Sequence, residues 1–335
     1  YDAEGVTGPR LLSNGTYTGL AWGYELASDG GTAYDGLGAV LLDPDDPFAE
    51  PVDYTLFSYA SETGDFGEVF DFGITDDFYI WGSSLIRPAP NAEREAWLDV
   101  YEIFSAGFAE SGYQTASDDY TSVPHDDYQI DVDVDGHIKA VVCDETEGVT
   151  YVVQATIEEI LADVFSTYVV ELPGAAGNRC EYSPSFEGYV VSSADARTLT
   201  WYSWINEELS QIDQRTAMDV RDIEASGDAL VIAEDTAGLL IWDMAGEATL
   251  PTSAPIEKVD IAEDGVGRLY LCTVDEAGAA GFLYGTTSDG LESVQVNTGM
   301  DTVEDCAVEV TPNGSRVIVA VRSGDDIAYS FAYTP

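Results

Sequence analysis

Short apolar runs alternate with polar turns along most of this chain. In the clearest stretch, an alternating segment at Met218–Glu224 precedes the turn Ser226–Asp228, the aliphatic run Ala229–Ala233 and a third run at Gly238–Asp243. Runs of this length, rich in β-branched and aromatic residues and bounded by Gly or Asp, predict β-strands. The stretch therefore predicts three strands joined by tight turns.

The same succession of three strands recurs about once every 40–50 residues, a period seen in propeller and solenoid repeats. The predicted units begin near Tyr17, Glu68, Tyr128, Arg179, Met218, Glu257 and Glu304. One such unit cannot bury its own apolar face, so neighbouring units must stack against each other. Three or four strands per unit at this period predict an all-β fold, a β-propeller with seven blades.

The repeats are expected to form a single domain over residues 1–335, because a repeat array grows by adding units. The last unit leaves no residues for a fourth strand. We expect residues 5–12 to supply that strand and close the ring, which would remove the open sheet edges. Thr156–Val164 has the capping box of a short helix, and residues 106–124 are expected to form a surface loop.

The charge is strongly one-sided, with 63 acidic and 12 basic residues and a formal net charge of −51. Such a chain repels phosphate backbones and anionic membranes, which argues against nucleic-acid binding. No apolar run is long enough to span a bilayer, so membrane insertion is not expected. The acids are spread along the chain, which indicates a surface adapted to salty surroundings. The alternative is a surface that gathers cations such as Ca²⁺.

Four cysteines, Cys143, Cys180, Cys272 and Cys306, fall at matching places in the repeats. The first pair links the second strand of one unit to the first strand of the next, and so does the second pair. We predict the disulfides Cys143–Cys180 and Cys272–Cys306, with four buried free thiols as the alternative. Disulfides would place the protein outside the cytosol, at the cell surface, in an extracellular assembly or in the periplasm.

Two further features agree with export. The chain begins at Tyr1 rather than Met, as expected of a processed terminus. Asn14 and Asn313 each begin an N-glycosylation sequon, although this short pattern also occurs by chance.

The segment from Glu234 to Met244 resembles the end of a WD40 repeat, in which an Asp turn and a Gly precede an aliphatic strand ending in Trp-Asp, here Trp242-Asp243. It also resembles the repeats of secreted bacterial propellers. The resemblance covers one unit well, and no other unit contains Trp-Asp. It implies the β-propeller superfamily without a particular function, and it implies that such tryptophans serve mainly in core packing.

The segment Asp131-Val-Asp-Val-Asp-Gly136 resembles the opening of a Ca²⁺ loop, with Asp131, Asp133 and Asp135 as candidate ligands. An EF-hand would need Glu at position 142, which is Val142, and an integrin-type propeller loop would need an acid where Lys139 stands. The alternative is an ordinary hairpin with its acids facing solvent. No cofactor is expected, and calcium is the one metal that the sequence suggests.

Catalytic motifs are sparse. His125 and His137 are the only histidines, and each lies beside aspartates that would favour the protonated imidazole. No nucleophile elbow, phosphate-binding loop or dinucleotide fingerprint is present. These observations favour a non-enzyme, although carboxylate pairs could meet in the folded chain.

The sequence thus favours an exported propeller that acts as a binding or scaffold module for a protein or glycan partner. Tyr113 and Tyr120, in the expected surface loop, are the candidate contact residues. The alternative function is a Ca²⁺-dependent hydrolase or lyase with an acidic central channel. Thermal unfolding at increasing Ca²⁺ concentration would distinguish the two.

Overall fold

A computed structural model describes the strands of the N-terminal half and most of the C-terminal half, with side chains described chiefly from residue 137 onward. The described ranges are 3–4, 9–13, 18–27, 33–42, 52–58, 79–81, 84–88, 96–103, 110–117, 127–132, 137–144, 149–156, 168–172 and, with short gaps, 179–333.

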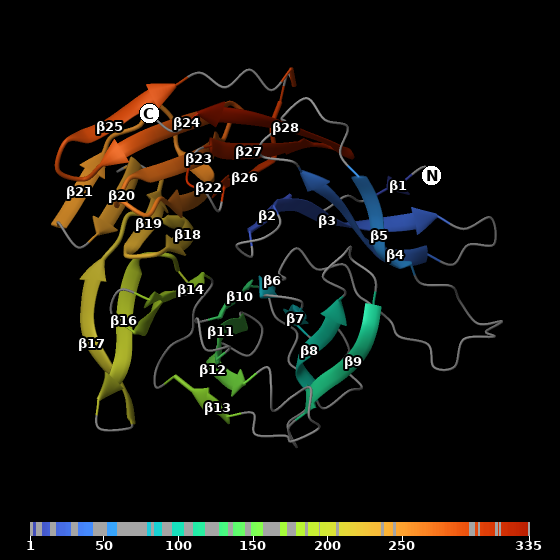
Figure 1. Cartoon of the computed structure of the whole chain (residues 1–335). Coiled ribbons are helices and arrows are strands. Elements are labelled where there is room, and N and C mark those ends of the chain that lie inside the picture. The colour runs from blue at the N-terminus through green and yellow to red at the C-terminus, as the bar shows by residue number, and fades with distance from the viewer. Residues whose placement is uncertain are drawn as a thin grey trace.

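The described residues form seven antiparallel sheets and no α-helix (Figure 1). Sheets 1 and 2 contain β1 (Ala3–Glu4), β2 (Arg10–Ser13), β3 (Thr18–Ala27), β4 (Ala33–Leu42), β5 (Val52–Ser58), then β6 (Tyr79–Trp81), β7 (Ser84–Pro88), β8 (Ala96–Ile103) and β9 (Glu110–Ser117). Sheets 3 and 4 contain β10 (Asp127–Val132), β11 (His137–Asp144), β12 (Val149–Thr156), β13 (Tyr168–Glu171), then β14 (Cys180–Ser183), β15 (Gly188–Ser192), β16 (Thr198–Ile205) and β17 (Glu208–Thr216). Sheets 5 to 7 contain β18 (Val220–Ser226), β19 (Ala229–Glu234), β20 (Gly238–Asp243), β21 (Gly246–Leu250), then β22 (Ile256–Glu263), β23 (Leu269–Asp275), β24 (Ala280–Thr286), β25 (Gly290–Val294), and finally β26 (Asp305–Val310), β27 (Arg316–Ser323) and β28 (Asp326–Tyr333).

Within sheets 2 to 7, each strand pairs with the one that follows it in the chain. This arrangement follows from the short turns, because pairing sequence neighbours closes small loops at low entropic cost. Sheets 2 to 6 have four strands, whereas sheet 7 has three among the described residues.

The first strands of the sheets contact one another in succession: β6 with β10, β10 with β14, β14 with β18, β18 with β22 and β22 with β26. β2 of sheet 1 contacts both β26 and β6. The sheets therefore lie side by side around a common centre, with their first strands innermost (Figure 1).

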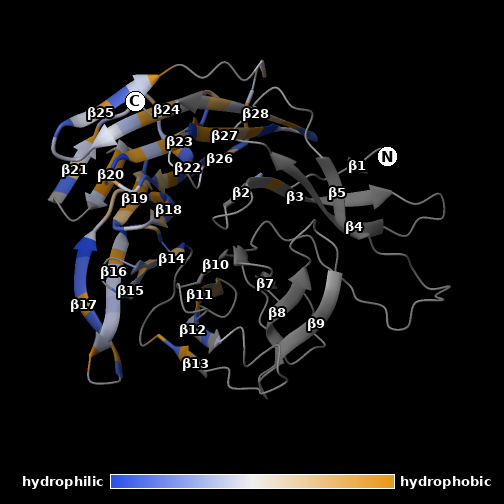
Figure 2. Cartoon of the chain, viewed as in Figure 1, coloured by the Kyte–Doolittle hydropathy of each residue, from blue (hydrophilic) through white to orange (hydrophobic). Residues whose placement is uncertain are grey.

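A hydrophobic core fills the space between each pair of neighbouring sheets in the C-terminal half. Val190 and Trp201 of sheet 4 pack with Ile232 and Leu240 of sheet 5, for example. The second strands carry more of these buried side chains than the first, third or fourth strands do, and every residue of β19 is buried. The outer strand β17 is mostly exposed and hydrophilic (Figure 2). Each described sheet of the C-terminal half thus buries apolar side chains against its neighbours, as a stacked repeat requires.

Three expectations differ from the structure. The segment expected to be a surface loop contains β9, which pairs with β8. Sheet 1 already includes β1 and β2, at Ala3 and Arg10, before the start expected near Tyr17. β2 pairs with β3 in sheet 1 and does not pair with sheet 7. A hairpin between Ser13 and Thr18 closes a far shorter loop than pairing with the other end of the chain would. Glu68 and the expected helix after Thr156 lie outside the described residues.

Candidate functional site

Carboxylates on the first strands connect neighbouring sheets. The Oδ2 atom of Asp222 on β18 accepts a hydrogen bond from the Val259 amide of β22 at 3.0 Å. The Oδ2 atom of Asp260 on β22 accepts one from the Val308 amide of β26 at 2.7 Å. In both contacts the donor residue directly precedes an acidic residue on its own strand: Val259 precedes Asp260, and Val308 precedes Glu309. The same contact therefore occurs at two successive seams between sheets.

Edge-strand chemistry explains this repetition. A first strand pairs on one side only within its sheet, so its outward N–H groups need another acceptor when they are buried. Asp222 is itself 5% exposed, and it satisfies the Val259 amide across the seam between sheets 5 and 6. These carboxylates therefore hold sheets together, and we call the contact the inter-sheet carboxylate bond.

Lys258 lies on β22 among these acids. Attraction to the Asp222 carboxylate, the largest effect, raises the pKa of Lys258 above its ordinary value, against the opposing effect of burial. Asp305 and Glu224 raise this pKa further. One of the two lysines in the chain thus neutralises the inner carboxylates. We call Asp222, Lys258, Asp260, Asp305 and Glu309 the first-strand cluster.

Glu309 on β26 is an acid of the first-strand cluster with a strongly raised pKa. Burial, together with repulsion from Asp260, raises the pKa of Glu309 to about 8. A carboxyl group in this range is largely protonated at neutral pH, which is the state that a general acid requires. It is also the state that a buried structural carboxyl adopts when a neighbouring carboxylate keeps its charge.

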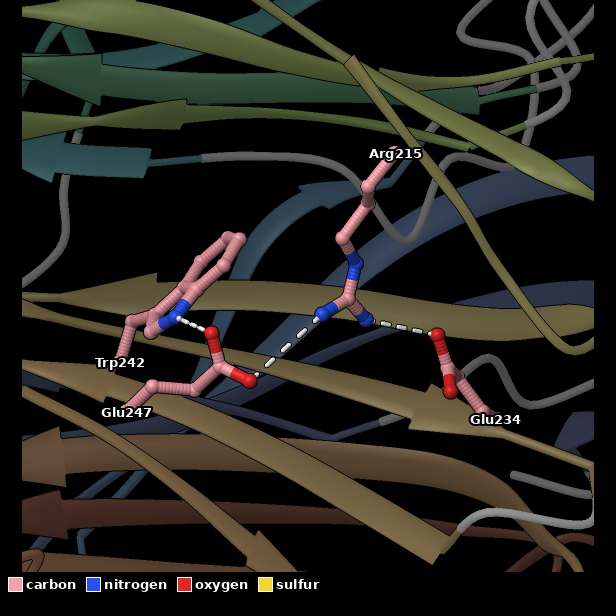
Figure 3. Close-up of polar contacts among 4 residues, drawn as sticks. All are labelled: Arg215, Glu234, Trp242 and Glu247. Atoms are coloured by element: carbon pink, nitrogen blue, oxygen red, sulfur yellow. Dashed lines mark hydrogen bonds and ion pairs between the residues drawn. The ribbon is translucent and has the colours of Figure 1, made fainter. Parts of the chain in front are cut away.

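A second polar cluster joins the outer strand of sheet 4 to β19, β20 and β21 of sheet 5 (Figure 3). The Arg215 guanidinium of β17 donates to Glu234 at 2.8 Å and lies 3.9 Å from a Glu247 oxygen. It also lies over the Trp242 ring, 5.2 Å from the ring centroid. The Trp242 indole donates a hydrogen bond to Glu247 at 2.8 Å. Its ring packs edge-on against the Trp201 ring, with 4.7 Å between the ring centroids. The Trp-Asp segment therefore serves in packing between sheets, in agreement with the WD40-like resemblance.

Aspartates in the turns organise the backbone. Asp264, between β22 and β23, accepts hydrogen bonds from the amides of Val266 and Arg268 and from the Tyr270 hydroxyl. Asp275, the last residue of β23, accepts hydrogen bonds from the amides of Ala277 and Ala279. Such Asx-type contacts replace water as the partner of turn amides, so these two acids are structural.

The proposed calcium segment is only partly described. Asp131 lies on β10 opposite Lys139, in the register of a hairpin, while Asp133 and Asp135 lie outside the described residues. Within the described part of the chain, no group of three or more His, Cys, Asp or Glu side chains is arranged to hold a metal ion.

Of the two candidate contact tyrosines, Tyr113 lies on β9 opposite Tyr101, and Tyr120 is outside the described residues. His137 begins β11, and His125 is not among the described residues either.

All four cysteines are free and buried, so neither predicted disulfide is formed in this structure. Burial raises the pKa of the Cys306 thiol well above its ordinary value, and the adjacent Cys272 thiol raises it further. The structure thus shows the reduced form of this pair.

Reasoning from the sequence did not single out the first-strand cluster or Arg215. One signal was available in the sequence. Lysine and arginine are so rare here that each buried cation is expected to pair with a particular group of carboxylates. Which acids surround Lys258 depends on how β18, β22 and β26 align, and the sequence pattern does not contain that alignment.

Several solved structures are similar to the chain over nearly its whole length. A protein from Lactobacillus plantarum superposes with a TM-score of 0.58 at 11% identity, covering 95% of both chains. U3-55K superposes with a TM-score of 0.53 at 10% identity, covering 98% of this chain and 99% of the other. A 6-phosphogluconolactonase candidate from Bacteroides uniformis gives 0.52 at 10% identity, covering 94% and 96%.

These likenesses, together with the sheets, define the class: an all-β repeat protein with a fold of the β-propeller type. At such low identity they establish the fold alone. No protein-family model matches the chain, and no curated protein does. The described residues include no helix with the length and apolarity required to cross a membrane.

Proposed function

We propose that this chain is a non-catalytic binding or scaffold module: an exported, seven-bladed propeller with a closed ring and a salt-adapted acidic surface. The observation that carries the proposal is the inter-sheet carboxylate bond. Asp222 and Asp260 are two of the inner acids that an enzyme could use, and both accept backbone hydrogen bonds from the next sheet. Groups engaged in this way favour a rigid frame over acid–base chemistry.

In this proposal the partner binds to exposed loops and outer strands, where binding sites on a rigid scaffold usually lie. We propose Tyr113, on the outer strand β9, and Tyr120 as contact residues for a protein or glycan. With a net charge of −51, the chain disfavours anionic ligands. The phosphorylated substrate named for the Bacteroides uniformis protein is therefore not carried over.

One observation favours the alternative, a Ca²⁺-dependent hydrolase or lyase. The pKa of about 8 for Glu309, beside Asp260, gives the protonated and ionised carboxyl pair used in acid–base catalysis. In this alternative, Glu309 would donate a proton while a bound ion oriented the substrate.

The first test presents the immobilised chain to a glycan array and a peptide library at low and high NaCl concentration. Saturable binding, with the ligand recovered intact by mass spectrometry, supports the binding module. Conversion of a ligand, or no binding under any condition, would overturn it. Tyr113→Ala should weaken binding at least several-fold, whereas Tyr54→Ala, on β5 of another sheet, is the matched control.

A second test distinguishes the binding module from the Ca²⁺-dependent enzyme. The unfolding midpoint is measured with added CaCl₂ and with NaCl of equal ionic strength, each with an EDTA control. The binding module predicts the same midpoint in both salts. A saturable, EDTA-reversible rise specific to Ca²⁺ would favour the enzyme, because a ligand that binds only the folded state raises its stability.

A further inference from the structure

Two pairs of cysteines occupy equivalent places in the fold. Cys143 lies on β11, the second strand of sheet 3, and Cys180 begins β14, the first strand of sheet 4. Cys272 lies on β23, the second strand of sheet 6, and Cys306 lies on β26, the first strand of sheet 7. β11 contacts β14 and β23 contacts β26, so each pair spans a seam between neighbouring sheets.

Each pair also shares one hydrophobic core. Cys143 and Cys180, both 0% exposed, lie in the core between sheets 3 and 4. Cys272 and Cys306, 1% and 5% exposed, lie in the core between sheets 6 and 7. The thiol of Cys272 lies near enough to Cys306 to raise the pKa of the Cys306 thiol. Cys143 shares a hydrogen bond with the Thr150 hydroxyl at 3.6 Å.

We propose that Cys143 with Cys180, and Cys272 with Cys306, are two disulfide-forming pairs that cross-link neighbouring sheets and close while the chain folds. The oxidant is a small-molecule disulfide such as oxidised glutathione. One cysteine thiolate attacks it, forming a mixed disulfide and releasing one glutathione thiolate. The second cysteine then displaces the other glutathione, so the protein loses two protons and two electrons for each bond.

Burial of the cysteines determines when the disulfides can form. A thiol attacks as the thiolate, and in the folded core the pKa of Cys306 is raised, so little thiolate is present. The same core excludes glutathione from all four sulfur atoms. Before neighbouring sheets meet, the thiols are exposed to the reagent. Oxidation during folding should therefore be much faster than oxidation of the folded, reduced protein.

The test begins with the full chain, unfolded and reduced, and refolds it at high salt in a buffer of reduced and oxidised glutathione. Remaining thiols are alkylated in denaturant, and the peptides are mapped by mass spectrometry. We expect linked peptides for Cys143–Cys180 and Cys272–Cys306. Four alkylated cysteines, or linkage between the two pairs, would overturn the proposal.

A second arm tests the timing. The chain is folded in reduced form and then given the same redox buffer, and cross-linking should be at least about 10-fold slower than during refolding. Equal rates would contradict closure during folding. The doubly oxidised chain should unfold at a midpoint higher by on the order of 10 °C.

Two variants probe the pairs separately. Cys306→Ala should leave Cys272 open to alkylation while Cys143–Cys180 still forms, and Cys180→Ala should do the reverse. If either variant fails to fold, the wild-type peptide map still decides the pairing. Loss of both disulfides in a single variant would show that the pairs are not independent cross-links and would overturn that part of the proposal.

Discussion

The Arg215 guanidinium lies 5.2 Å from the centroid of the Trp242 ring and joins the outer strand of sheet 4 to the face of sheet 5. Trp242 belongs to the only Trp-Asp pair in the sequence, and its partner across the seam is one of twelve basic residues. A residue type that is scarce in this chain is therefore placed where a planar cation contacts a ring and two carboxylates at once.

Replacing Arg215 with lysine should destabilise the protein although the charge is retained. Lysine cannot reproduce the planar fork toward Glu234 and Glu247 or the flat contact with Trp242, so we expect a loss of about 1–2 kcal/mol in unfolding free energy. Urea unfolding followed by tryptophan fluorescence measures it. Arg197→Lys, at an exposed position, is the control. Equal losses in both variants would contradict the cation–ring contact.

The inter-sheet carboxylate bond can be tested at Asp260. Asp260→Ala leaves the Val308 amide without its acceptor and should cost about 1–3 kcal/mol. Asp260→Asn keeps an acceptor oxygen and should cost clearly less. Hydrogen exchange at the Val308 amide should accelerate in the alanine variant only. Glu276→Ala removes an exposed carboxylate as a control for charge, and a loss as large as that of Asp260→Ala would refute the assignment.

Glu309 should make stability fall as the pH rises. Its pKa is about 8 in the folded chain and about 4.3 in an unfolded one, so between these values the folded state holds a proton that the unfolded state releases. The stability that this group contributes is complete below about pH 4.3 and is lost as the pH rises through 8.

Urea unfolding at several pH values between 5 and 9, at fixed high salt, measures this dependence. In Glu309→Gln the fall should be shallower than in the wild type, because the amide does not titrate. Glu276→Gln is the matched control and should follow the wild type. Parallel curves for all three proteins would rule out a raised pKa at Glu309.

Gly238 should not tolerate a side chain. Its φ is +89°, and an added Cβ would collide with the Leu250 carbonyl oxygen of β21. We expect Gly238→Ala to cost about 3 kcal/mol or more, since both the backbone and the strand pairing must shift. Gly290→Ala is the control: its φ of +92° is similar, but no atom lies within 4 Å of the added Cβ. Gly290→Ala should cost about 1 kcal/mol of unfolding free energy. Equal losses in the two variants would show that the positive φ alone, and not the contact with Leu250, makes glycine necessary at position 238. The melting temperatures of the two variants, compared with that of the wild type, measure these losses.

Strand positions in the C-terminal half followed from the sequence pattern because each strand is a local feature. Starts expected near Arg179, Met218, Glu257 and Glu304 compare with observed starts at Cys180, Val220, Ile256 and Asp305. Apolar alternation and Gly or Asp turns act over a few residues, so they can be read without knowing the neighbours. The loop expected around Tyr113 was wrong because the β9 segment is polar and shows no apolar alternation, while its pairing with β8 is a contact between distant residues that the pattern does not contain.

The sequence by itself determined the all-β repeat, the acidic surface and the matching places of the four cysteines, because these depend on composition and local periodicity. Only the tertiary structure decided that β2 joins sheet 1, that Asp222 and Asp260 bond to the next sheet, and that Lys258 lies among carboxylates. Those contacts arise where strands about forty residues apart lie side by side. Their alignment is set by packing between sheets, which no single repeat encodes.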